Sequence, residues 1–189
     1  MDPQTLTELL DVSVLDRLDR IEDLPADELA RSSALRKEGY SAEVTAGLLT
    51  QAQLRKDAVK KLGPFAEDML FTRDGLAQAT RLPVAAHHAR RLLGEGKDTG
   101  GDAADTGESA DSAPTIADLG CGIGADSFAF AGMGAQVTAV DADEVTAAIA
   151  SFNLRHLANA SVEHARAEDI DTTDFDALWF DPARRTVGK

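Results

Sequence analysis

The stretch TIADLGCGIGADSFAFAGMGAQVTAVD, residues 115–141, decides the fold of this protein. It opens with a short apolar run at 115–119 and passes through a glycine-rich loop at 120–124 into a helix of small residues that ends near Met133. A second apolar run follows at 136–140. A strand, a glycine loop, a helix and a second strand in this order predict the βαβ unit of a parallel sheet.

The same alternation continues to the end of the chain. A helix is expected from about 144 to 157, and strands are expected around 161–165 and at 177–180. The predicted fold class is therefore α/β, with the first half of a Rossmann-like, doubly wound parallel sheet. Such a sheet buries both faces and usually has more than four strands. Because the sequence ends just after the fourth, we expect either that the polypeptide is a fragment or that something else covers the open edge of the sheet.

The residues before this sheet have a different pattern, and three segments are predicted. Residues 1–93 read as a helical N-terminal subdomain, in which Ser41 caps a long helix that Gly63 and Pro64 stop. Residues 94–114 carry no large apolar side chain and six acids against one lysine, which predicts a flexible acidic linker. Residues 115–189 form the predicted sheet domain.

Composition excludes several classes of protein. The 189 residues are 43% hydrophobic without any membrane-length apolar run, and the sole cysteine allows no internal disulfide, so a soluble protein of the reducing cytoplasm is expected. The net charge of −14 argues against broad attachment to nucleic acid. Residues 55–91 differ, with eight bases against four acids. That stretch is either a solvated helix face or a local landing site for a polyanion.

The glycine loop predicts a site for a nucleotide-type cofactor. Glycines let the backbone approach a ligand closely, and the following helix start offers a positive end to it. Asp141 ends the next strand 21 residues after Gly120, where a carboxylate can accept both ribose hydroxyls. Because Gly120, Gly122 and Ala125 also match the GxGxxA form of the NAD fingerprint, the glycine spacing alone leaves two cofactors open.

Three further motifs favour S-adenosylmethionine. Asp118 lies two residues before the first glycine, Asp169 ends an Ala-Glu-Asp run after the third strand, and an Asp-Pro pair follows the fourth. Over about 115–185 the chain thereby resembles the class I S-adenosylmethionine-dependent methyltransferases. The resemblance implies a cofactor site made by Asp118, Gly120, Cys121, Gly122 and Gly124 on the methionine side, Asp141 and Ala142 at the ribose, and Asp169 at the adenine. It implies a catalytic pair, Asp181 and Pro182, beside the acceptor amine.

A narrower resemblance comes from FTRDGLAQAT at 71–80 and DPARR at 181–185. These stretches are similar to a bacterial family, common in actinobacteria, that carries a C-terminal THUMP-like domain missing from this chain. The family implies methylation of an amino group in RNA, with tRNA as the expected substrate. Phe71 and Thr72 are similar to a substrate- or cofactor-covering segment in related RNA cap methyltransferases, and the guanidinium groups of Arg184 and Arg185 can contact a substrate phosphate. A purely structural role is the alternative for each pair. Phe71 would be a core aromatic followed by Thr72 as a helix cap, and the two arginines would form salt bridges at the surface or between domains.

Two other functions stay open on the sequence. One is an NAD-type oxidoreductase, and the other is a non-catalytic module that binds cofactor weakly or mediates protein contacts. The aromatic that follows Asp-Pro-Pro in many base methylases is absent here, and Trp179 and Phe180 are expected in the core of the last strand. The histidines have no metal-ligand spacing and Cys121 has no acid-base partner, so neither metal nor covalent catalysis is predicted.

Overall fold

The computed structural model describes residues 1–94 and 113–181, and its elements follow the predicted order. The helices are α1 (Pro3–Leu9), α2 (Val12–Asp19), α3 (Glu28–Lys37), α4 (Ala42–Leu62), α5 (Arg73–Gln78), α6 (Leu82–Leu92), α7 (Ala125–Gly132) and α8 (Glu144–Leu154). The strands are β1 (Thr115–Leu119), β2 (Gln136–Asp141), β3 (Ala160–His164) and β4 (Ala177–Phe180). The predicted bounds of the first and fourth strands are confirmed.

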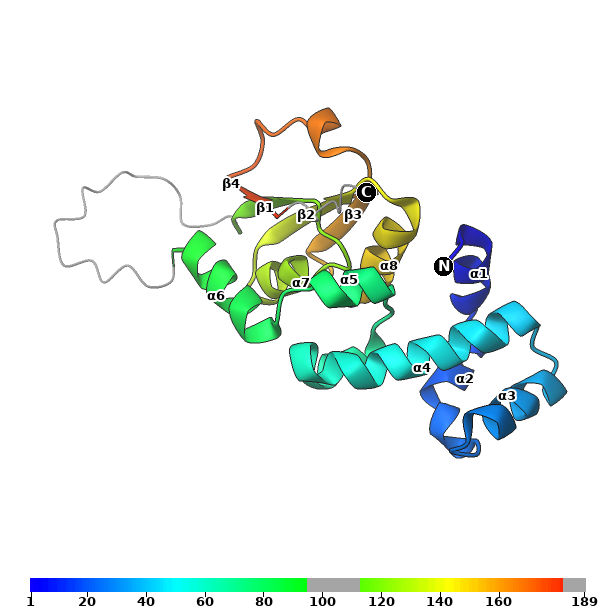
Figure 1. The fold of residues 1–189 in the computed structure, drawn as a ribbon. Helices are drawn as coiled ribbons and strands as arrows, with labels where there is room; N and C mark the ends of the chain where they lie inside the picture. Colours follow the sequence, from blue (N-terminus) through cyan, green and yellow to red (C-terminus); the bar gives the residue numbers. More distant parts are fainter. Residues whose placement is uncertain (95–112, 182–189) are drawn as a thin grey trace, which may run out of the picture.

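The four strands form one parallel sheet in the order β3-β2-β1-β4. This order equals the first four strands of the Rossmann arrangement, so the predicted α/β, Rossmann-like sheet is confirmed. Figure 1 shows α7 and α8 together on one side of the sheet. Because all four strands run the same way, their carboxyl ends meet at one edge, and the loops that follow them lie close together.

The two faces of the sheet are covered differently. Ile116 and Val137 pack with α6 and α7 on one face, and Trp179 packs against the same cluster. On the other face, a smaller cluster is covered by the segment between β3 and β4. Here Leu178 and Phe180 remain 48% and 61% exposed. The prediction that Phe180 is a core residue is therefore wrong, because strand alternation turns it to the thinly covered face.

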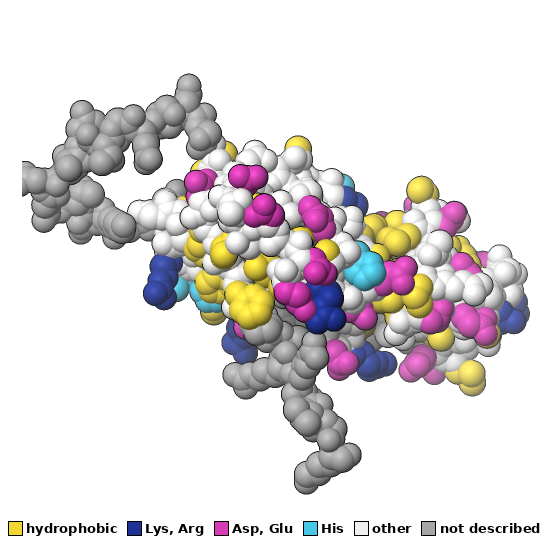
Figure 2. All heavy atoms as spheres, turned by 90° about the horizontal axis from the view of Figure 1, so that it is seen from above, with side chains coloured by type: hydrophobic (Ala, Val, Ile, Leu, Met, Phe, Trp, Pro, Cys, Tyr) yellow, Lys and Arg dark blue, Asp and Glu magenta, His cyan; other side chains and the backbone are white. Residues whose placement is uncertain are grey.

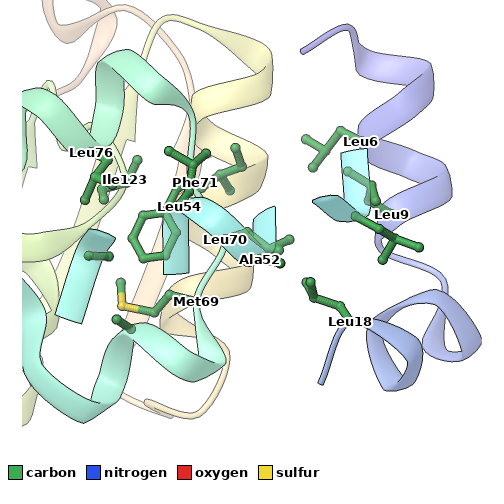
Figure 3. Close-up of a cluster of buried hydrophobic side chains, with 14 of the residues drawn as sticks. Leu6, Leu9, Leu18, Ala52, Leu54, Met69, Leu70, Phe71, Leu76 and Ile123 are labelled. Carbon is green, nitrogen blue, oxygen red and sulfur yellow. The ribbon is translucent and has the colours of Figure 1, made fainter. Parts of the chain in front are cut away.

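The helical N-terminal region shares its core with the sheet region. Leu6, Leu9 and Leu18 from α1 and α2 belong to one cluster of buried side chains with Ile123 from the glycine loop and Ile149 from α8. Figure 3 shows side chains of this cluster, from Leu6, Leu9 and Leu18 on one side to Leu76 and Ile123 on the other. The boundaries 1–93, 94–114 and 115–189 stay a prediction, and residues 95–112 of the expected linker lie outside the described part.

Helix α4 connects the two regions and is bounded as the sequence predicts. The Ser41 side chain accepts a hydrogen bond from the Val44 amide at its start. Gly63 ends it with a φ of 62°, a conformation that favours glycine. Neither this helix nor any other in the described ranges is long and apolar enough to cross a membrane.

Candidate functional site

The glycine loop, residues 120–124, turns sharply between β1 and α7. Gly120, Gly122 and Gly124 have φ values of 88°, 58° and 84°, which side chains rarely tolerate, so the three glycines are required by the turn itself. The carbonyl of Val140 accepts hydrogen bonds from the amides of Gly120 and Cys121 at 2.8 and 2.9 Å. The loop is thereby fixed to the end of β2.

Asp141 fixes the same loop from its side chain. Its Oδ2 accepts the Gly122 amide at 3.0 Å, and its Oδ1 accepts the Asp143 amide at 2.9 Å. The predicted ribose-binding carboxylate and the predicted glycine loop are therefore in direct contact. This contact holds the carboxylate at the edge of the sheet, where a ligand on the loop would meet it.

A cavity of about 690 Å³, here called the central cavity, lies at the carboxyl ends of the strands. That volume is ordinary for a small-molecule site. The predicted residues that line it are Thr72, Asp118, Gly120, Cys121, Gly122, Asp141, Ala142 and Asp181. Pro182, Arg184 and Arg185 lie outside the described residues. The structure thus brings most of the described candidates to one place.

Three predicted residues are not on the wall of the central cavity. Gly124 directly precedes α7, and an added Cβ there would lie 3.4 Å from Leu154. Asp169 is exposed, and the preceding acid, Glu168, lines the cavity instead. Phe71 is fully buried in the core, directly before Thr72, which caps α5 by accepting the Gly75 amide. The adenine role of Asp169 and the substrate role of Phe71 stay predictions.

Asp118 has the most perturbed environment in the site. It is 2% exposed, and the Ser127 hydroxyl donates a hydrogen bond to it. Burial, together with the nearby carboxylates of Asp126 and Asp181, raises its pKa from 3.8 to about 7, against the opposing effect of the Ser127 hydrogen bond. Burial likewise raises the pKa of the Cys121 thiol, which therefore stays protonated at neutral pH, as an unreactive cysteine should.

A polar network around Asp126, on the wall of the central cavity, was not predicted from the sequence. Thr80 donates to Asp126 Oδ2 at 2.6 Å, and His88 Nδ1 lies 2.9 Å from Asp126 Oδ1. The His88 ring stacks near Trp179, with ring centroids 4.5 Å apart. Of these four residues, all but His88 line the cavity. The local sequence signal for this network is weak: the helix that carries His88, α6, has polar residues among its apolar ones.

The described wall of the central cavity is strongly acidic. Its acids are Asp74, Asp118, Asp126, Asp141, Asp143, Glu168 and Asp181, its basic side chain is Arg166, and Met1, which carries the N-terminal ammonium, also lines it. Most of the charged side chains on the face shown in Figure 2 are acidic as well. No group of three or more acidic, histidine or cysteine side chains within 1–94 and 113–181 has the arrangement of a metal site. A cavity with this charge attracts cationic ligands.

Comparison with known proteins finds two family models that match parts of this chain. Residues 116–183 match the family model described as a methyltransferase domain. These residues are therefore similar to a methyltransferase domain. Residues 2–58 match a separate family model described only as a domain of unknown function, DUF8688. The methyltransferase match thus contains the glycine loop and Asp141, while most of α4 belongs to the DUF8688 match.

Curated relatives extend this likeness beyond the residues of the methyltransferase match. An uncharacterized S-adenosylmethionine-dependent methyltransferase, found in two strains of Mycobacterium tuberculosis, is 31% identical over 148 residues. The match covers 75% of this chain and 36% of the relative, so the chain spans about a third of the relatives' length.

Two solved structures are also similar. The N-terminal domain of EvdMO1, with S-adenosylhomocysteine bound, has a TM-score of 0.41 at 18% identity. The match covers 67% of this chain and 51% of the EvdMO1 chain. Coclaurine N-methyltransferase bound to N-methylheliamine and S-adenosylhomocysteine has a TM-score of 0.39 at 16% identity. The match covers 94% of this chain and 54% of that enzyme's chain.

Proposed function

We propose that this protein is an S-adenosylmethionine-dependent methyltransferase that modifies an amino group of RNA, with tRNA as its RNA class. The observation that carries the proposal is the acidic central cavity, where the glycine loop, Asp141 and Asp181 meet. The protein acts in the cytoplasm, where reducing conditions keep Cys121 a free thiol.

The charge of the central cavity separates the two cofactors that the glycine spacing leaves open. S-adenosylmethionine carries a sulfonium and an ammonium, which carboxylates such as Asp141 and Asp181 attract. A dinucleotide carries a diphosphate, which the same carboxylates repel. The acidic wall therefore supports S-adenosylmethionine as the cofactor and argues against NAD.

The residues of this chain have few chemical tasks in such a reaction. Bound S-adenosylmethionine supplies a methyl carbon that its sulfonium already activates. Asp181, on the cavity wall after β4, accepts an N–H of the acceptor and so turns the nitrogen lone pair toward that carbon. The proton released after transfer passes to water or to a carboxylate of the wall. Trp179 and Thr80 shape the space around the acceptor and exclude water.

The RNA part of the proposal rests on the resemblance of 71–80 and 181–185, and the basic stretch adds less to it than its charge suggests. Three of its cations make internal contacts: Arg55 with Asp19, Lys56 with Glu22, and Lys61 with carbonyls of α5. The other bases of the stretch, all exposed, are Lys60, Arg73, Arg81, Arg90 and Arg91. We expect the four arginines of this set to bind the phosphates, because a guanidinium can pair with a phosphate through two hydrogen bonds.

The cofactor is tested first, by isothermal titration of the purified protein with S-adenosylhomocysteine and, separately, with NADH. We expect the first ligand to bind and the second to give no heat. Binding of NADH alone would replace the proposal by an oxidoreductase. Binding of neither ligand would favour a non-catalytic module.

The acceptor is tested with methyl-labelled S-adenosylmethionine and RNA from cells that lack the gene. We expect label in tRNA on an exocyclic amine, as identified by mass spectrometry of nucleosides. Asp181→Ala should abolish the transfer and leave S-adenosylhomocysteine affinity within about twofold, because this carboxylate contacts the acceptor and not the cofactor. Label in small amines but not in RNA would refute the RNA substrate, and a fully active Asp181→Ala variant would refute the role of Asp181.

A further inference from the structure

We propose that α4, most of which belongs to the domain of unknown function, has a defined role in the cofactor site. It holds α5 at both ends as a fixed wall of the central cavity, and Gln51 and Lys61 are the positioning residues. The inference rests on the proposed cofactor site but not on the identity of the methyl acceptor.

Helix α5 needs such support because it is short. It has six residues, fewer than an isolated helix needs to be stable in water. Nevertheless it contributes much of one wall of the central cavity, through Asp74, Gly75 and Gln78, with Thr72 before it and Thr80 after it. Its position therefore depends on contacts with other elements.

The chain that enters α5 is held by two buried amide side chains. Gln51 of α4, which is fully buried, donates to the Phe71 carbonyl at 2.8 Å and accepts the Phe71 amide at 3.0 Å. Asn153 of α8 makes the same pair of bonds to Leu70 and also donates to the Ile123 carbonyl in the glycine loop at 2.9 Å. The start of α5 is thus tied to α4 and to the glycine loop at once.

The end of α5 is held by a lysine of the same long helix. Lys61 Nζ donates to the carbonyls of Leu76 and Ala77 at 2.7 Å each and to the carbonyl of Ala79 at 3.2 Å. An ammonium has three N–H donors, so all three are used on carbonyls that α5 leaves without helical partners. The positive charge also complements the negative end of the helix.

The geometry of α4 makes the two contacts act together. Gln51 and Lys61 are ten residues apart on one unbroken helix, which corresponds to about 15 Å along its axis. One rigid rod therefore fixes both ends of the shorter helix. The middle of α5 touches the glycine loop, because Gly75 lies so near that an added Cβ would be 2.5 Å from Ile123 Cγ2. Figure 3 shows Ile123 beside Leu76 of the same helix. A shift of α5 would therefore reach the loop that the cofactor needs.

The test compares Lys61→Met with Lys60→Met in the full-length protein. Lys60 is the exposed neighbour on the same helix, so its variant controls for the loss of charge. We expect Lys61→Met to weaken S-adenosylhomocysteine binding by roughly 10-fold and Lys60→Met to leave it unchanged, as measured by isothermal titration. Lys61→Arg, which keeps a cationic donor, should restore most of the affinity.

Hydrogen exchange separates this inference from the proposed function. Lys61→Met should speed amide exchange in α5 and leave exchange in α7 unchanged, whether or not the cofactor binds. Unchanged exchange in α5, or equal ligand affinity of the two lysine variants, would overturn the role of α4. Failure of the unmodified protein to bind S-adenosylhomocysteine would instead remove the cofactor assignment.

A second pair of variants tests the other end. Gln51→Met should weaken ligand binding at least as much as Lys61→Met, whereas Gln53→Met, at an exposed position of the same helix, should leave it unchanged. Equal affinities of these two glutamine variants would contradict the role of Gln51. Should Gln51→Met fail to fold, the lysine pair Lys61→Met and Lys60→Met decides the proposal.

Discussion

Asp141 uses both of its carboxylate oxygens within the protein before any ligand is considered. One oxygen accepts the Gly122 amide and the other accepts the Asp143 amide. Each carboxylate oxygen can accept a second hydrogen bond, so the ribose hydroxyls can still be received. The residue therefore has two tasks: it fixes the glycine loop and it offers acceptors to the cofactor.

Replacing Asp141 by alanine removes both tasks. We expect Asp141→Ala to weaken S-adenosylhomocysteine binding by roughly 10- to 100-fold, the loss of one or two charge-assisted hydrogen bonds, as measured by isothermal titration. Asp171→Ala is the matched control, because Asp171 also accepts the amide two residues ahead but lies outside the central cavity. Equal affinities of the two variants would exclude Asp141 from the binding site.

Asp118 links the site to pH. Because its folded pKa is about 7 and its ordinary value is 3.8, the folded chain holds a proton that the unfolded chain releases between these values. The free energy of unfolding therefore falls as pH rises through this window, and the loss is complete above pH 7.

Asp118→Asn, which mimics the protonated carboxyl, should remove this dependence. The quantity to compare is the free energy of unfolding of this variant minus that of the unmodified protein. We expect this difference to be larger at about pH 8 than at about pH 5, by on the order of 1 to 3 kcal/mol. Urea unfolding of both proteins at the two pH values measures this difference. Other titrating groups contribute equally to both proteins, so their effects cancel. A difference that does not change with pH would show that Asp118 is ionised throughout.

At the scale of elements, the packing of α5 on the glycine loop depends on one missing side chain. An alanine Cβ at Gly75 would lie 2.5 Å from Ile123 Cγ2 and 2.7 Å from the Thr72 hydroxyl. Alanine normally stabilises a helix relative to glycine, so the crowding and the intrinsic helix preference oppose each other here. The crowding wins because Ile123 is fixed within the core.

Gly75→Ala should therefore destabilise the protein by about 1 to 3 kcal/mol in urea unfolding and weaken ligand binding. Gly132→Ala, in α7, has no neighbouring atom within 4 Å of the added Cβ and should be neutral or stabilising. The same stability change in both variants would mean that α5 moves freely away from the loop.

At the scale of the whole molecule, the buried cluster that joins α1 and α2 to Ile123 and Ile149 makes the two regions depend on each other. Trp179 is the sole tryptophan and lies in β4, so its fluorescence reports the sheet region. Far-ultraviolet circular dichroism reports mainly the helices, most of which precede the sheet.

We therefore expect tryptophan fluorescence and circular dichroism to show coincident unfolding in urea, because neither region keeps its core without the other. The midpoints should agree within experimental error. A separate, earlier transition in circular dichroism would instead show that the N-terminal helices unfold as an independent subdomain.

The sequence by itself determined the elements of the sheet and the meeting of the glycine loop with Asp141. Both follow from local pattern: periodicity sets each strand, and neighbouring parallel strands end at the same edge. Only the tertiary structure decided which other side chains join the site. Gln51, Thr80 and Asp126 meet partners that are 20 to 46 residues away, and no local spacing encodes such contacts. The exposure of Phe180 was decided in the same way, because burial depends on what covers a face and not on the strand itself.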